Sequence, residues 1–300
     1  MRSVPPFPLL RTILARVALA SLVLATGAWA QGPVTDDLGR EVRLAAPPER
    51  VVSMIPSHTE TVCALGACDR LVGVDTFSNH PDGVADLPDL GSAFDADLER
   101  LIALEPDLVL TDEYSGLAEA LAPLGIPVYA GMAERTDEVW EIVAEVAALL
   151  DRRAAGALLI GRAEGRVEAL TDAAPEAGGP RVFVELDATP YSVGPRSYLG
   201  QLLRRAGARN IVPAELGDFP QVDPELVIEA DPEVILLLDA PFGERLETVA
   251  ERPGWAGIDA VRSGRVIELT QDQVDVLTRP GPRLPEALAL LLDLLAAEDR

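Results

Sequence analysis

Apolar side chains recur at helical spacing throughout residues 136–174. They fall at Val139, Val143, Val146 and Leu150, and again at Leu158, Ile160, Val167 and Leu170. This i, i+3/i+4, i+7 spacing is typical of helices that bury one stripe of their surface. The stretch also lacks proline up to residue 175, and a proline inside a helix costs roughly 3 kcal/mol. The pattern therefore predicts that the stretch is helical.

Two helices fit this stretch better than one. We place the first at about residues 137–150 and the second at about residues 152–171, with Asp151 capping the second where it begins. At about 1.5 Å per residue the second helix would be about 30 Å long, which is the diameter of a small domain. Such a helix is long enough to join two domains rigidly.

Strand-like apolar runs and helical stretches alternate on both sides of this connection. Before it, a hairpin turning at Gly39 leads to predicted strands at 51–55, 71–74, 108–110 and 126–129, with helices after Asp97 and at 117–124. After it, strands are predicted at 182–186, 234–236 and 265–269, with helices at 199–206 and 284–297. This alternation is typical of parallel sheets covered by helices.

An internal repeat relates the two halves. Residues 98–110 align without a gap with residues 224–236. Each segment has a glutamate near a helix start, a proline that stops the helix, and a buried strand. We therefore predict an α/β fold with two similar lobes, residues 31–135 and 175–300, connected by helical residues 136–174.

Residues 1–30 have the features of an export signal. Three arginines accompany a short apolar run at 17–26, and Ala-Trp-Ala at 28–30 forms a cleavage site before Gln31. The run is shorter than the roughly twenty residues of a transmembrane helix. No cysteine follows it at a lipoprotein cleavage position. We therefore expect a cleaved signal peptide, no lipid anchor, and a periplasmic or otherwise extracytoplasmic location.

The charge balance narrows the choice of partners. The chain has 49 acidic residues against 25 basic ones, all of them arginine, and a net charge of −24. A surface of this sign repels phosphate backbones and anionic lipid headgroups. Nucleic acid and an anionic membrane surface are therefore poor partners, and the acidity by itself is more typical of solubility than of function.

The two cysteines, Cys63 and Cys68, lie five residues apart. Thiols of exported proteins tend to be oxidised. In an unbroken helix their Cα atoms would be too far apart for a bridge, but Gly66 between them can end the helix and let the chain fold back. A disulfide and two buried free thiols both remain possible, and either would be structural.

A polar segment follows the first buried strand directly. Ser57-His58-Thr59-Glu60 matches a capping box, in which the Ser57 hydroxyl and the Glu60 carboxylate would satisfy free amides of the first helical turn. Its position after a strand is also that of a ligand-facing loop in an open α/β sheet. The two roles are compatible.

The usual catalytic motifs are missing. The sequence contains no G-x-S-x-G elbow, no Walker loop and no G-x-G-x-x-G after a strand. Its two histidines, His58 and His80, are fewer than zinc sites commonly require. We expect no metal, no cofactor and no catalysis. An exported α/β enzyme acting through cleft carboxylates is the alternative of another class, and it would leave a bound candidate ligand chemically changed.

A cleft between the lobes, faced by the loops that follow the strands, is the expected small-molecule site. The groups available there are Ser57, His58, Thr59, Phe77, Asn79, Phe94, Asp112, Tyr114, Tyr191, Phe219 and Asp272. Aromatic residues make up 4% of the chain, so the occurrence of Phe77, Tyr114, Tyr191 and Phe219 in loops is a notable concentration. They either face a ligand or pack against the core of their own lobe.

Five motifs in order carry a family resemblance. They are PSHTE at 56–60, VGVDTFSNHP at 72–81, residues 98–109, VGPRSY at 193–198 and FPQV at 219–222. With these motifs the chain resembles the periplasmic substrate-binding proteins of ABC importers for cobalamin, iron siderophores and haem, and most closely the cobalamin-binding branch. The resemblance covers essentially all of the mature chain. It implies two Rossmann-like lobes with parallel sheets joined by a single long inter-lobe helix, and little hinge motion.

The resemblance also implies partners. They are a small-molecule ligand held in the cleft and an ABC transporter permease with its ATPase. In that family one glutamate on each lobe docks with permease arginines, and the matching residues are Glu99 and Glu225. Gly194, in the fourth motif, joins the ligand-binding candidates. We expect the protein to be a monomer.

Ligand identity follows less closely from the resemblance. In the cobalamin-binding branch several aromatic side chains pack the corrin ring, and Phe77, Tyr191 and Phe219 match such positions. Asp112 and Gln273 stand where a bulky aromatic is expected, so a large flat ligand would gain less apolar contact. We predict capture of a cobalamin-like corrinoid, with a ferric siderophore or haem as the alternative. Haem would require a histidine or a tyrosine as its axial ligand.

Overall fold

A computed structural model describes residues 32–175 and 178–296. The predicted signal peptide at 1–30 lies outside these ranges. Within them, no helix is both long enough and apolar enough to span a membrane. The described chain is built around two parallel four-stranded sheets, which belong to one compact unit beginning at Pro33.

The first sheet has the strand order β4-β3-β7-β8. Its strands are β3 (Val51–Ser53), β4 (Leu71–Val74), β7 (Leu108–Thr111) and β8 (Val128–Ala130), all in parallel. The accompanying helices are α2 (Pro56–Ala64), α3 (Leu98–Ala103) and α4 (Leu117–Leu121). The strands are apolar and almost fully buried, as a parallel sheet covered on both faces requires. We call this sheet and its helices the N-lobe.

The second sheet has the order β10-β9-β11-β12 and is also parallel throughout. Its strands are β9 (Arg181–Glu185), β10 (Arg209–Asn210), β11 (Val234–Leu237) and β12 (Val266–Glu268). Its helices are α7 (Tyr198–Arg205), α8 (Pro224–Ala230), α9 (Leu246–Glu251), α10 (Asp259–Arg262), α11 (Gln271–Thr278) and α12 (Leu284–Ala296). We call this part the C-lobe. The predicted α/β class with two parallel sheets is confirmed, and each sheet lies inside one predicted lobe range, whose outer boundaries stay a prediction.

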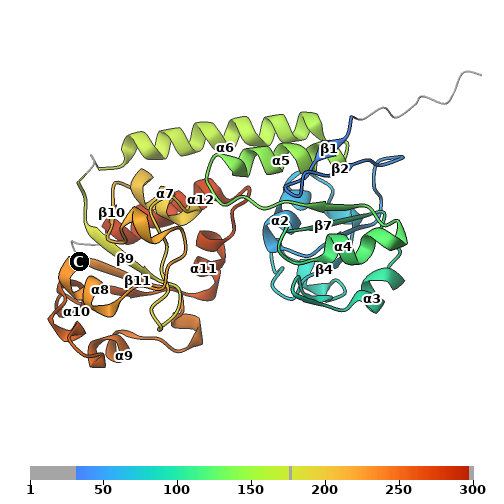
Figure 1. Ribbon diagram of the computed structural model, residues 1–300. Coiled ribbons are helices and arrows are strands. Elements are labelled where there is room, and N and C mark those ends of the chain that lie inside the picture. Colours follow the sequence, from blue (N-terminus) through green and yellow to red (C-terminus); the bar gives the residue numbers. More distant parts are fainter. Residues whose placement is uncertain (1–31, 176–177, 297–300) are drawn as a thin grey trace, which may run out of the picture. The chain divides into compact units, whose positions relative to one another are not determined.

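Two consecutive helices connect the lobes. They are α5 (Glu138–Leu149) and α6 (Arg153–Ala173), close to the predicted bounds. The long helix α6 packs against α5 and against α12 of the C-lobe (Figure 1). The expected cap at Asp151 was wrong: Asp151 adopts a left-handed conformation with φ 56° between the two helices, and Arg152 precedes α6 without a side-chain cap. Aspartate is one of the residues that tolerates this conformation.

The internal repeat extends to the backbone. Helices α3 and α8 both begin after an aspartate whose carboxylate accepts a backbone N–H bond, Asp97 in one and Asp223 in the other. Glu105 and Asp231, one residue before the stopping prolines, share a left-handed φ of 46°. The repeated sequence therefore specifies the same cap, stop and strand in both lobes.

Two small antiparallel hairpins complete the N-lobe. Strands β1 (Val34–Thr35) and β2 (Glu41–Val42) pair around the predicted turn, where Gly39 has φ 73°. Strands β5 (Gly91–Ser92) and β6 (Asp95–Ala96), which the sequence did not predict, pair next to α3. The Asp37 amide donates to the Ala130 carbonyl, so the first hairpin is fastened to the edge of the sheet at β8.

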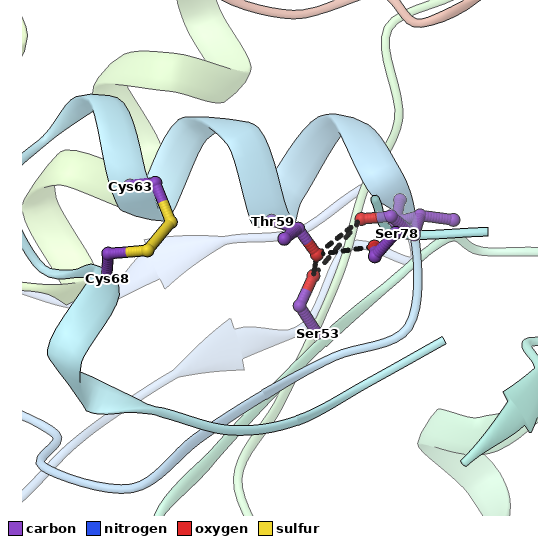
Figure 2. Close-up of a disulfide and its surroundings, with 6 residues drawn as sticks. Ser53, Thr59, Cys63, Cys68 and Ser78 are labelled. Atoms are coloured by element: carbon purple, nitrogen blue, oxygen red, sulfur yellow. Dashed lines mark hydrogen bonds between the residues drawn. A yellow bond between two sulfur atoms is a disulfide. The ribbon is translucent and has the colours of Figure 1, made fainter. Parts of the chain in front are cut away.

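Cys63 and Cys68 form a disulfide (Figure 2). Gly66 adopts φ 72° just beyond the end of α2, as the sequence had suggested for a chain that folds back there. Glycine suits this position because it has no Cβ to oppose a positive φ. The disulfide therefore closes the turn that follows α2.

The capping box predicted at Ser57 was wrong. Helix α2 begins one residue earlier, with Pro56 in its first turn, and Ile55 precedes it without any side-chain cap. Proline fits the first turn because its missing N–H would have no partner there. Ser57 is therefore inside the helix, and the Glu60 carboxylate binds two arginines of the C-lobe instead of the helix start.

Candidate functional site

An apolar cavity of about 420 Å³ lies between the lobes. The N-lobe contributes Tyr114, Met132, Ala133 and Glu134, and the C-lobe contributes Leu186, Val193, Tyr198, Leu199, Phe219, Leu277, Thr278 and Pro280. Its volume falls in the range of about 300–1,000 Å³ that is usual for small-molecule pockets. Several lining residues directly follow β8 and β9, so the cavity lies at the carboxyl ends of both sheets, where open α/β folds bind ligands.

Tyr114 is placed at the cavity by the turn after β7. The buried Asp112 carboxylate accepts bonds from the amides of Tyr114 (2.8 Å) and Ser115 (2.7 Å). The Tyr114 hydroxyl donates to Glu134 at 2.7 Å, and this hydrogen bond raises the pKa of the phenol. Asp112 is therefore used to shape the turn, and Tyr114 presents a neutral phenol to the cavity.

Phe219 reaches the cavity from a loop that packs tightly on the segment before α7. The Gly194 amide donates to the Asp218 carbonyl at 2.8 Å. A Cβ at Gly194 would lie only 1.9 Å from the Gly217 carbonyl oxygen. Gly194 therefore allows two backbones to approach closely and does not line the cavity, whereas the Phe219 side chain stays 57% exposed at its edge.

A second, acidic hollow of about 200 Å³ adjoins the cavity and shares Tyr114, Met132 and Glu134 with it. Its carboxylates are Asp37, Glu113, Glu134, Glu138, Glu141 and Glu145. Burial raises the pKa of the carboxyl groups of Asp37, Glu113 and Glu145. No metal-binding group of three or more His, Cys, Asp or Glu residues occurs in the described chain. Six carboxyl groups therefore border the cavity on this side.

Beside the cavity, Arg279 of the C-lobe is held by four groups. It follows α11, which ends in the cavity-lining residues, and it is only 7% exposed. Its guanidinium donates to Glu60 (3.0 Å), to the Asn79 side-chain oxygen (2.8 Å) and to the Phe77 carbonyl (2.8 Å) of the N-lobe. It also pairs with Asp275 of its own lobe at 2.8 Å.

Glu60 is the N-lobe centre of this contact. It is 3% exposed, and Arg283 binds both of its carboxylate oxygens, at 2.8 and 2.5 Å. Bidentate arginine–carboxylate pairs are among the strongest hydrogen-bonded contacts in proteins. We call Glu60, Asn79, Asp275, Arg279 and Arg283 the cross-lobe clamp. It ties the two lobes together at a second place besides α6.

The predicted ligand groups of α2 are all buried. His58 is 1% exposed, and its Nε2 lies 2.8 Å from the Gly131 carbonyl oxygen, while burial lowers the pKa of the imidazole to about 4. The Thr59 hydroxyl lies 2.8 Å from those of both Ser53 and Ser78 (Figure 2). Ser57 is buried as well. None of the three predicted α2 residues lines the cavity, because their partners lie within the fold.

The remaining predicted ligand residues are dispersed around the cleft. Phe77 and Phe94 are 62% and 73% exposed, and Tyr191 is 43% exposed, but none of the three lines the cavity. Asn79 is engaged by the clamp, donating to Asp275 at 2.7 Å. Asp272 is exposed in the first turn of α11, whose cap is formed by other residues. The structure thus brings Tyr114 and Phe219 together at the cavity and leaves the others outside it.

Glu99 and Glu225 occupy equivalent places. Each is exposed in the first turn of its helix, α3 or α8, next to a capping aspartate. Within the described chain neither has an ion-pair partner, so each carboxylate is available at the surface.

The sequence analysis did not predict most of the apolar residues that line the cavity. Leu186 directly follows β9 and Met132 lies two residues after β8, so a search of positions after each strand would have found both. Leu277 and Pro280 could not be found in this way, because α11 was not predicted. The clamp arginines were missed because Glu60 had been assigned to the start of its own helix.

The chain matches a known protein family. The sequence profile of the periplasmic binding protein family matches residues 51–273, well over half of the chain. The chain belongs to this family. Its members serve ABC importers as non-enzymatic substrate-binding proteins, so this chain is an extracytoplasmic substrate-binding protein whose partners are a small ligand and a transporter.

Individual relatives agree with that assignment. The chain is 29% identical over 274 residues to the uncharacterised ABC transporter substrate-binding lipoprotein YvrC of Bacillus subtilis, covering 87% of this chain and 85% of the relative. It is 28% identical to a cobalamin-binding protein of Halobacterium salinarum, covering 86% and 72%. Among solved structures, the periplasmic heme-binding protein BhuT with two hemes matches with a TM-score of 0.72 at 31% identity, covering 82% of this chain and 97% of BhuT.

Proposed function

We propose that the protein captures a cobalamin-like corrinoid in the inter-lobe cleft and delivers it to the permease of an ABC importer. The observation that carries this proposal is the composition of the cleft: an apolar cavity lined by three aromatic side chains, Tyr114, Tyr198 and Phe219, and bordered by carboxylates. A cobalamin-binding relative at 28% identity supports the same ligand class.

The charge at the cavity margin favours a corrinoid over haem. Haem carries two propionate carboxylates, and many ferric siderophores are also anionic. Glu134 lines the cavity itself, and the other carboxylates of the acidic hollow lie next to it. Like charges in a partly buried site repel each other. The periphery of a corrinoid is instead rich in neutral amides, which can donate hydrogen bonds to these carboxylates.

The residues available for axial ligation also disfavour haem. His58 is in the core with its Nε2 directed at the Gly131 carbonyl, and His80 is exposed and does not line the cavity. Tyr114 and Tyr198 do line it, but the Tyr114 hydroxyl donates to Glu134, which raises the pKa of that phenol, and burial raises the pKa of the Tyr198 phenol. A phenolate able to bind iron is therefore unfavourable at either position.

Further aromatic surface for a flat ring lies outside the cavity. Tyr114 and Phe219 line the cavity, and Phe77 and Tyr191 are exposed in loops that follow strands of the two lobes. A ring larger than the cavity would rest on the inner pair and extend onto the outer pair. Each such contact removes apolar area from water, at about 25 cal/mol per Å².

Haem binding is the second candidate, because the likeness to BhuT with its two hemes reaches 31% identity. Calorimetric titration of the mature chain with cyanocobalamin, haemin and a ferric hydroxamate siderophore separates the candidates. We expect cyanocobalamin to bind with micromolar or tighter affinity, about −8 kcal/mol. Saturable binding of haemin or siderophore without any corrinoid binding would replace the proposal by the second candidate.

Export and docking complete the proposal. We infer that the chain leaves the cytoplasm with a signal peptide cleaved before Gln31, acts as a monomer, and presents Glu99 and Glu225 to arginines of the permease. The signal order of residues 1–30 and the equivalent exposed positions of the two glutamates support this view. Secreted protein that retains Met1 by terminal sequencing would contradict the cleavage.

A further inference from the structure

Four arginines meet around a hollow of about 380 Å³ that is separate from the ligand cavity. It is lined by Arg135, Thr136, Asp137, Pro195, Arg196, Gln201, Arg204 and Arg205. Among the described residues none lines both this hollow and the cavity. The lining thus carries four positive charges and one negative charge, in a chain whose net charge is −24.

Two of these arginines have no acidic partner. Arg135 pairs with Glu138 and lies 3.9 Å from Asp137, and Arg196 lies 3.4 Å from Asp218. For Arg204 and Arg205, no carboxylate of the described chain stands within ion-pair distance. The Nε of Arg205 is in addition buried without any hydrogen-bond partner among the described residues. A buried donor without a partner is unfavourable, so this arrangement is incomplete as it stands.

The neutral polar groups of the hollow are already satisfied. The Thr136 hydroxyl donates to the Gln201 side-chain oxygen at 2.6 Å, and the Gln201 side-chain amide donates to the Arg196 carbonyl at 2.8 Å. These bonds fix α7 against the segment that precedes α5. The guanidinium groups of Arg204 and Arg205 are therefore the donors that remain for a molecule entering the hollow.

The position of Arg204 and Arg205 in the last turn of α7 accounts for part of this pattern. Basic side chains interact favourably with the carboxyl end of a helix. That effect does not explain why Arg135 and Arg196, from two other segments, converge on the same hollow. Positive charges that converge repel one another unless an anion lies between them.

We propose that this hollow binds a compact phosphate-type oxyanion, either free or as part of a larger molecule. Guanidinium groups present planar pairs of N–H donors that match phosphate oxygens in a bidentate manner. Arg204 and Arg205 supply the binding donors, while Arg135 and Arg196 line the edge of the hollow and are paired with carboxylates. The site is independent of the corrinoid cavity, so the two ligands bind separately.

The test measures binding of inorganic phosphate and pyrophosphate to the full mature chain by calorimetry and by the shift of Tm. Ionic strength is held constant with sodium chloride, so that general screening is equal in all samples. The variant is Arg204→Gln/Arg205→Gln. The matched control is Arg162→Gln/Arg166→Gln, which removes the same charge from two exposed arginines of α6.

We expect pyrophosphate to bind and to raise Tm in the wild type and in the control. The Arg204/Arg205 variant should lose at least about tenfold in affinity, since two charge-assisted donors are removed. The affinity for corrinoid should be the same in the wild type and in both variants. A lack of corrinoid binding in all three would count against the proposed function and not against the phosphate site. The site is refuted if phosphate stabilises the wild type no more than chloride does, or if the variant retains the full effect.

A vesicle arm identifies the source of the phosphate group. Wild type and variant are sedimented with vesicles of phosphatidylglycerol and, for comparison, of phosphatidylcholine. Retention on phosphatidylglycerol that requires Arg204 and Arg205 assigns the site to a lipid headgroup. Pyrophosphate binding without such retention assigns it to a soluble phosphate compound, as the strong negative charge of the protein favours.

Discussion

The cross-lobe clamp differs in burial and polarity from the exposed aromatic residues Phe77 and Phe219 of the cleft, which we call the rim. In the clamp, Glu60 and Arg279 are almost fully buried, and every charged group has a partner within hydrogen-bond distance. At the rim, Phe77 and Phe219 expose more than half of their surface. The clamp is polar and its charged groups are paired, whereas the rim is apolar and exposed.

The two regions place different demands on geometry. Buried ion pairs need precise geometry, because an uncompensated buried charge is very unfavourable. The clamp therefore pairs specific residues of the two lobes. Exposed aromatic groups impose no such demand and can meet a ligand without prior rearrangement. The Phe77 carbonyl accepts from Arg279, so the clamp also positions one residue of the rim.

The largest expected effect comes from breaking the clamp. Glu60→Gln would leave Arg279 and Arg283 buried without their shared carboxylate, and removing one partner of a buried pair costs about 3–5 kcal/mol. Urea unfolding at neutral pH measures the loss of unfolding free energy. Glu164→Gln, an exposed change on α6, is the control and should be near neutral. A loss as small as that of the control would show that the clamp does not stabilise the fold.

The next effect is a pH dependence of stability caused by the burial of His58, which has no ion-pair partner among the described residues. His58 is buried in the N-lobe, where burial lowers the pKa of its imidazole to about 4 and keeps it neutral. The unfolded chain, with the ordinary histidine pKa, takes up the proton first as the pH falls below about 6.5. The contribution of His58 to stability should therefore decrease progressively from about pH 6.5 to about pH 4, by about 3 kcal/mol in total. The difference in unfolding free energy between the wild type and His58→Gln should change by this amount over this range.

Asp239 should make stability change with pH in the opposite direction. Burial and the neighbouring Glu185 raise the pKa of its carboxyl group to about 7, and neither of its carboxylate oxygens has a hydrogen-bond partner in the described chain. Here the folded state holds the proton more tightly, so stability decreases as the pH rises from about 4 towards about 7. Asp239→Asn should remove this decrease. Identical pH profiles for wild type and both variants would contradict both assignments.

A smaller change in free energy is expected at the rim. Phe219→Ala should weaken corrinoid binding by about 2 kcal/mol, because a large apolar contact is lost, while the unfolding free energy stays close to that of the wild type. Leu158→Ala on the exposed face of α6 is the control. Calorimetric titration gives the affinities. Unchanged affinity in Phe219→Ala would place the ligand elsewhere.

The smallest effect on folding and ligand binding is expected at the docking pair. Glu99→Ala/Glu225→Ala should leave both nearly unchanged, since each carboxylate contributes only a few tenths of a kcal/mol to its helix start. Ligand-stimulated ATPase activity of the reconstituted importer should nevertheless be mostly lost. Glu119→Ala/Glu247→Ala, which removes one first-turn glutamate from each lobe, is the matched control. Normal transport by the Glu99/Glu225 variant would show that these residues only stabilise the starts of their helices and do not dock with the permease.

The sequence predicted the elements that depend on local pattern. The buried strands, the two connecting helices and the repeat were all recognisable, because periodicity and proline position are properties of short segments. It did not predict α9, α10 and α11, which are short and have weak periodicity. Without α11, the cavity residues Leu277 and Pro280 had no predicted position.

The main error of the sequence interpretation was also one of distance along the chain. Glu60 stands three residues after Ser57, which satisfies a local capping rule, but its partners lie 219 and 223 residues away. Asp151 was likewise assigned to a local cap and instead takes a left-handed turn. Polar residues have several short-range roles available to them, and only tertiary packing decides among these roles.

The distance between the lobes tests the central account most directly. Cysteines introduced at the exposed positions Glu99 and Glu225 can carry spin labels, since both native cysteines are bridged to each other. With the clamp intact, the distance distribution between the labels should be narrow and should stay the same when corrinoid is added. In the Glu60→Gln background it should broaden. If the mean distance in the intact protein became clearly shorter when corrinoid binds, the lobes would close on the ligand. That result would contradict a clamp that holds the lobes in one arrangement.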